Sequence, residues 1–72
     1  MQYLLNLSTP FFRGVNTKGR VRINYRVIAH QFEAVSDKAA LQKTRKTVEE
    51  SRVSYKDKHY DAHVQGLYRR VL

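Results

Sequence analysis

The sequence contains no cysteine and no tryptophan, only one proline and only three glycines. Without cysteine, the chain has no disulfide framework, no thiolate nucleophile and no thiolate ligand for a metal ion. Its apolar runs are short, and none approaches the roughly 20 residues that a membrane-spanning helix needs. The apolar N-terminal stretch MQYLLNLSTPFF lacks the basic residues that begin a secretory signal peptide. These absences predict a cytoplasmic protein with no membrane partner.

Sequence signatures of catalysis are also missing. The glycines form no phosphate-binding loop, and no serine lies in a nucleophile-elbow motif. His59, Asp61 and His63 alternate in the string HYDAH, so on a strand they would share a face, with His30 as a further metal ligand. This spacing matches no metalloenzyme signature, and solvated polar side chains explain it more simply. We therefore predict no catalytic residue, no metal site, no cofactor and no enzymatic activity.

Acidic residues are few, and their distribution is uneven. The chain has 14 basic and 6 acidic residues, for a formal net charge of +8. Residues 1–12 carry no charge, residues 13–30 carry five basic and no acidic residues, and residues 51–72 carry five basic and two acidic ones. Such a concentrated excess is typical of a protein with a polyanionic partner, although it also serves simply to keep a small protein in solution.

Hydrophobic periodicity predicts strands in the first half of the chain, which we expect to form a single domain over residues 1–72. In QYLLNL, Tyr3, Leu5 and Leu7 fall on one face, and Pro10 indicates that this strand lies at a sheet edge or bends there. VNTKGR predicts a hairpin turn over residues 15–20, and a long second strand is expected over residues 20–34.

The second half predicts one helix and a C-terminal hairpin. Ser36 is a good N-cap for a helix over residues 37–50, whose apolar stripe is Ala40, Leu41, Thr44 and Val48. RVSYKDKHYDAHVQG favours a hairpin, whereas the spacing of apolar residues over 60–71 also fits a helix interrupted by a glycine. The predicted fold is α+β, a small antiparallel β-β-α-β-β sheet with one helix packed on one face.

The stretch GRVRINYRVIAH carries the functional prediction. One parity holds Val21, Ile23, Tyr25, Val27 and Ala29, and the other holds Arg20, Arg22, Asn24 and Arg26. If the apolar parity packs against the helix, the arginines lie on the open face of the sheet. Arginine pairs with phosphate oxygens and guanine edges, and asparagine pairs with adenine. The predicted nucleic-acid-binding residues are Lys18, Arg20, Arg22, Asn24, Arg26, Arg69 and Arg70. DNA is favoured over RNA because a small antiparallel sheet fits the major groove.

Two simpler explanations compete with this surface. The arginines serve equally well to shield an exposed face or edge from aggregation. Phe11 and Phe12 beside Arg13, like Tyr68 beside Arg69, either complete the core or stack on the bases of a single-stranded ligand.

The alternative function is protein–protein binding. A small inhibitor or adaptor of the phage or mobile-element type would use the basic face to bind a protein partner with an acidic surface. The uncharged N-terminal strand then predicts a homodimer, or a partner bound along that edge. A salt titration separates the two functions, because phosphate binding weakens steeply with salt and apolar binding does not.

Overall fold

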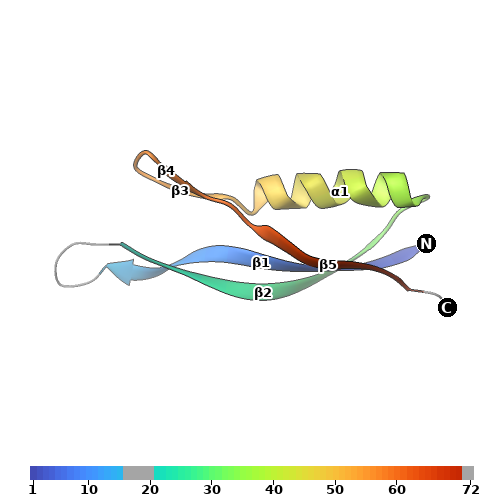
Figure 1. Cartoon of the computed structure of the whole chain (residues 1–72), viewed down its shortest axis with the longest axis horizontal. Helices are drawn as coiled ribbons and strands as arrows, with labels where there is room; N and C mark the ends of the chain where they lie inside the picture. Colours follow the sequence, from blue (N-terminus) through green and yellow to red (C-terminus); the bar gives the residue numbers. More distant parts are fainter. Residues whose placement is uncertain (16–20, 71–72) are drawn as a thin grey trace.

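Five strands and one helix make up the described part of the computed structural model, residues 1–15 and 21–70. In chain order the elements are β1 (Gln2–Val15), β2 (Val21–Glu33), α1 (Asp37–Glu50), β3 (Val53–Tyr55), β4 (Lys58–Tyr60) and β5 (His63–Arg70). β2, β1 and β5 form an antiparallel sheet in that order, and β3 and β4 form a separate hairpin (Figure 1).

The fold is therefore mixed α+β, with one strand more than the sequence predicts. The C-terminal third forms three strands joined by short turns, so the hairpin interpretation is confirmed and the helical alternative is wrong. The predicted hairpin of residues 52–66 divides, because β3 and β4 pair with each other while β5 joins the main sheet. The turn expected between the first two strands falls largely on residues 16–20, which lie outside the described residues.

β1 is the central strand of the sheet. It pairs with β2 along its length and with β5 from Gln2 to Ser8, so the prediction of a free edge for a homodimer is wrong over these residues. The pairing with β5 stops at Ser8, so Pro10 lies where β1 has β2 as its one neighbour. A strand with one unpaired side tolerates the missing N–H of proline. Arg13 is skipped in the register between Phe12 and Gly14 and forms a β-bulge.

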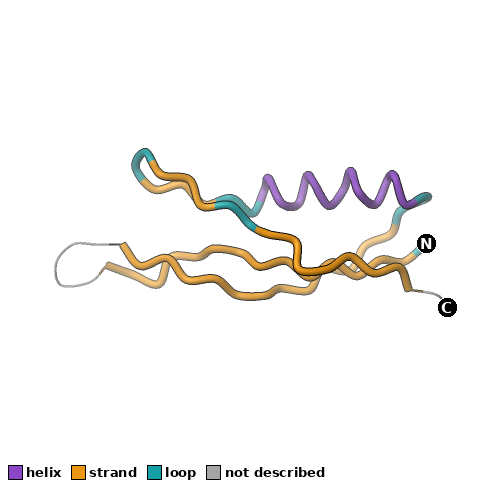
Figure 2. The backbone as a smooth tube through the Cα atoms, viewed as in Figure 1, coloured by secondary structure: helices purple, strands orange, loops and turns teal. Residues whose placement is uncertain are grey.

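The core lies between this sheet and α1, which runs along one face near the two termini (Figure 2). Tyr3, Leu5 and Leu7 are buried there, which confirms the parity predicted for the first strand. Ser36 caps the helix as predicted, because its Oγ accepts a hydrogen bond from the Ala39 N–H at 3.1 Å. The helix buries only small side chains, which are Ala40 and Thr44. Leu41 is 53% exposed, so its assignment to the packed stripe is wrong.

β2 presents to the helix the parity opposite to the predicted one. Phe32 pairs with Tyr3, and the two rings stack with centroids 5.6 Å apart; Ile28 pairs with Leu7. Since directly paired residues share a face, the even-numbered residues of β2 lie on the α1 side. Val27 is accordingly 64% exposed on the other side of the sheet. The expectation that the odd-numbered residues of this strand are buried under the helix is wrong.

Candidate nucleic-acid interface

The arginines of β2 lie on the same face of the sheet as the helix but beyond its end. Arg26 pairs with Thr9 and Asn24 with Phe11, which places both on the parity of Leu7. The helix covers the half of the sheet near the termini, while the hairpin of β3 and β4 extends over the other half (Figure 1). Arg22 and Arg26 are exposed and Asn24 is half-buried. The arginines are thus accessible, but they lie on the helix side of the sheet and not on the open face that the sequence predicted.

Aromatic and amide groups of the first hairpin, formed by β1 and β2, contact the arginine side chains. The guanidinium carbon of Arg26 lies 4.9 Å from the centre of the Phe11 ring, a cation–π geometry. The bulge residue Arg13 reaches Asn24. With the amide oriented to satisfy both neighbours, Asn24 Oδ1 accepts from Arg13 Nη1 at 3.2 Å and its Nδ2 donates to the Ile23 carbonyl at 3.3 Å. The Asn24 amide is therefore engaged within the protein.

The second hairpin adds two lysines to this end of the molecule. Tyr55 of β3 packs edge-on against Phe12 of β1, with ring centroids 5.7 Å apart, so the two hairpins touch. Lys56 Nζ lies 5.6 Å from the centre of the Tyr55 ring, and Lys58 pairs with Tyr55 across the β3–β4 ladder. These contacts bring residues from the two basic segments of the sequence to one end of the fold.

We call this group of five exposed side chains the basic end: Arg13, Arg22, Arg26, Lys56 and Lys58. Within the described parts of the two hairpins, residues 9–14, 22–27 and 53–60, Asp57 is the one acidic residue. Arg52 and Asp61 lie just outside and neutralise each other, with Nε and Oδ1 2.7 Å apart. The surface at this end therefore has a strong positive charge that the fold does not compensate.

Two of the predicted site residues lie at the opposite end of the sheet. Arg70 pairs with Gln2, whereas Arg22 pairs with Gly14. At about 3.3 Å per residue, the two positions are about 40 Å apart along β1. Arg69 is drawn to the start of the helix, where its Nη1 lies 4.0 Å from Asp37 Oδ1. The structure therefore does not bring Arg69 and Arg70 together with the arginines of β2, and Lys18 and Arg20 lie outside the described residues.

Three site residues were missing from the sequence prediction: Arg13, Lys56 and Lys58. The charge run marked Arg13, but only the bulge shows that it turns toward Asn24. The lysines lie in a turn, and their role depends on the contact between Phe12 and Tyr55, which no local pattern indicates.

The residues of the HYDAH string have separate contacts. His59 Nδ1 is 2.8 Å from Ser54 Oγ on the outer part of the β3–β4 hairpin. Asp61 pairs with Arg52, and the ring of His63 lies 6.2 Å from that of Tyr25 on the side of the sheet away from α1. Within residues 1–15 and 21–70, no group of three or more histidine or acidic side chains is arranged to hold a metal ion.

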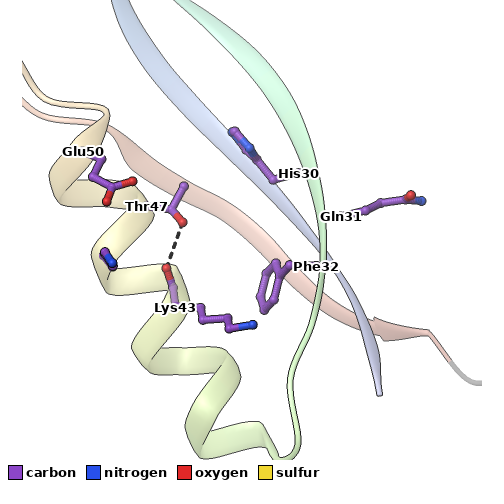
Figure 3. A pocket seen from close by; sticks show the side chains of 7 residues that line it. His30, Gln31, Phe32, Lys43, Thr47 and Glu50 are labelled. Atoms are coloured by element: carbon purple, nitrogen blue, oxygen red, sulfur yellow. Dashed lines mark hydrogen bonds between the residues drawn. The ribbon is translucent and has the colours of Figure 1, made fainter.

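A pocket of about 300 Å³ lies between the edge of β2 and α1 (Figure 3). His30 and Phe32 point toward the helix, and Gln31 points away from it. Lys43 extends from α1 across this pocket. Its Nζ donates to the Glu33 carbonyl and lies 5.8 Å from the centre of the Phe32 ring. A lysine bound to an edge carbonyl hinders the addition of another strand there, so we interpret Lys43 as protecting the edge of β2.

No protein-family model, no curated protein and no solved structure matches this chain. Among the residues that the structure describes, no helix is both long and apolar enough to cross a bilayer. The function of this chain is therefore inferred from the charges, contacts and exposure of its own residues.

Proposed function

We propose that this protein binds nucleic acid through its basic end, as a binding protein and not as an enzyme. The observation that carries the proposal is the convergence of five exposed basic side chains from two hairpins, with one acidic residue among them. Lysine and arginine at such a surface neutralise phosphates and release the counterions condensed on the nucleic acid, and this release drives binding.

The shape of this end favours double-stranded DNA over double-stranded RNA. Beyond Ser8, the described part of β1 pairs with β2 alone, so the sheet narrows to a two-stranded ribbon. Neighbouring strands lie about 4.8 Å apart, and the major groove of B-DNA, about 12 Å wide, admits a two-stranded ribbon. The major groove of A-form RNA is too narrow for such side chains. The guanidinium of Arg26 lies over Phe11, which favours an extended, preorganised position for contact with phosphate or guanine.

The test is a salt titration of duplex DNA binding, measured by fluorescence anisotropy, with matched double variants. Five phosphate contacts predict a log–log salt slope of about −4.5 for the parent protein. R22A/R26A removes two charges from the basic end and should flatten the slope by about two units. R69A/R70A removes the same charge from the opposite end and should leave the slope unchanged.

Two results would contradict the proposal. Equal losses in the two double variants would mean that binding depends on net charge and not on the basic end. If no binding to duplex DNA is detected even at low ionic strength, the arginines serve only to keep the protein in solution. That second result would favour the protein-binding alternative, in which an inhibitor or adaptor binds an acidic protein surface.

A further inference from the structure

The face of the sheet opposite α1 is open and carries large apolar side chains among neutral polar ones. By register its apolar members include Leu4 on β1, Tyr25, Val27 and Ala29 on β2, and Tyr68 on β5, and its polar members include Asn6, Ser8, Gln31 and His63. Tyr25, Val27 and Tyr68 are exposed to 47%, 64% and 55%. No element within the described residues covers this face (Figure 1). Several large apolar side chains exposed on one face of a small domain mark an interaction surface.

The covered face supplies a small core. Leu5 and Leu7 are the large side chains that the fold buries completely. The helix buries Ala40 and Thr44, and its Val48 packs against the core while only partly buried. The accessible surface is 5688 Å² for a chain of 8.5 kDa. A compact monomer of this mass exposes about 4,650 Å², so this chain covers less of its surface than a compact domain of the same mass does.

Among the described residues, the charged side chains of the open face lie at the end near the termini. Gln2 pairs with Glu33 on one side and with Arg70 on the other, so the acidic and the basic residue flank β1 on the same face. The Gln2 Nε2 donates to Glu33 Oε1 at 2.9 Å, which confirms that these two share the open face. Arg69, the neighbour of Arg70, turns to the helix side instead.

We propose that the open face binds a second copy of this chain, with the two sheets packed face to face about a two-fold axis parallel to the strands. This axis places β2 of one copy over β5 of the other and keeps equivalent strand ends together. Glu33 of each copy then lies opposite Arg70 of the other, Leu4 lies next to the axis and opposite Leu4 of the other copy, and Val27 lies opposite His63. Aligned packing of two sheets about 10 Å apart is a common arrangement of twisted antiparallel sheets.

Other surfaces fit a second copy less well. β1 has both edges paired from Gln2 to Ser8, and Lys43 bonds to the edge of β2 at Glu33. In the face-to-face dimer, Arg22 and Arg26 lie on the outer faces of the two sheets, because their parity is that of the helix side. Dimerisation therefore leaves the basic end of each copy accessible, and the proposal is independent of nucleic-acid binding.

The first test measures mass by sedimentation equilibrium. We expect the parent protein at about twice the chain mass of 8.5 kDa. V27E places a charge at a position that the second copy covers and should yield monomers. L41E makes the same kind of change at a leucine that is 53% exposed on α1, and should remain dimeric. Circular dichroism checks that both variants are folded. A parent protein that stays monomeric at high concentration, or an L41E variant that dissociates like V27E, overturns the proposal.

The second test determines the orientation by charge reversal. E33R or R70E alone places like charges opposite each other twice in each dimer and should raise the dissociation constant by about tenfold. An equimolar mixture of the two variants should restore dimers, because both contacts are then attractive in the heterodimer. The E33R/R70E double variant should also regain the parental affinity. If V27E dissociates the dimer but neither charge reversal does, the proposed two-fold axis is wrong.

Discussion

The hydroxyl of Tyr3 donates a hydrogen bond to Oδ1 of Asp37 at 2.6 Å, and so joins the central strand to the first turn of the helix. Tyr3 is only 2% exposed. The bond to Asp37, the burial of the ring and the negative charge of that carboxylate raise the pKa of Tyr3 above its ordinary value, and nearby Arg69 lowers it in part. Asp37 lies in the first turn of α1, where its negative charge also interacts favourably with the helix dipole.

This raised pKa predicts a loss of stability in alkaline solution. An unfolded tyrosine loses its proton near pH 10, whereas the folded protein keeps the Tyr3 proton to higher pH. The contribution of the protonated hydroxyl is therefore complete below about pH 10 and is lost as the pH rises through the folded pKa. Chemical denaturation between pH 8 and pH 11 should show a fall that Y3F reduces. A Y3F curve parallel to that of the parent would contradict this assignment.

The small core predicts unequal effects for the same substitution at two leucines. L5A removes a side chain with no exposed surface and should lower the free energy of unfolding by about 2–5 kcal/mol. L41A removes a side chain that is 53% exposed and should change it by about 0.5 kcal/mol or less. Urea denaturation measures both values. Similar losses would mean that Leu41 packs into the core, as the helical periodicity predicted.

Local patterns predicted those parts of the fold in which one interpretation dominates. The alternation of Tyr3, Leu5 and Leu7 identified the buried face of β1, and Ser36 identified the start of the helix. In β2, both parities carry apolar residues, so alternation alone did not indicate the buried side. Its register with β1 decides, because Ile28 pairs with Leu7.

The sequence predicted the positive charge of the site but not the surface on which that charge lies. The run of basic residues over 13–30 correctly indicated a positive region, and Arg22 and Arg26 are exposed within it. The face predicted for these arginines was wrong, because the odd-numbered residues of β2 were expected to be buried. The two lysines of the second hairpin join them through the contact between Phe12 and Tyr55, a long-range packing event. Such a contact depends on where β5 begins and how far the first hairpin twists, which sequence periodicity does not specify.

The two described glycines are expected to respond to alanine for different reasons. Gly14 follows the bulge and has φ of +130°, a conformation that costs an alanine about 1–3 kcal/mol although its β-carbon meets open space. At Gly66, a β-carbon would lie 2.6 Å from Cε2 of the Tyr68 ring, which covers it. That ring is the mobile end of a side chain, so it should move and the backbone should not.

We therefore expect G14A to destabilise the fold more than G66A in urea denaturation, despite the crowding at Gly66. G66A should instead displace Tyr68 from the open face, which the loss of the ring-current shift of the residue 66 α-proton would report by NMR. A larger loss of stability for G66A would mean that the Tyr68 ring is fixed in place.

Phe11 and Phe12 are adjacent, yet we expect the same substitution to affect DNA binding differently at each. F11L removes the ring over which the Arg26 guanidinium lies, while the charge of Arg26 remains. Losing a cation–π contact of about 0.5–1 kcal/mol should weaken binding about two- to fivefold with an unchanged salt slope. F12L removes the contact with Tyr55 that holds the second hairpin, so Lys56 and Lys58 should leave the interface and the slope should flatten by up to about two units.

Fluorescence anisotropy at four salt concentrations measures both quantities, and R69A/R70A serves as the control at the opposite end of the sheet. Identical slopes for F11L and F12L would mean that the second hairpin does not contact the DNA, and the interface would then be limited to the ribbon of β1 and β2.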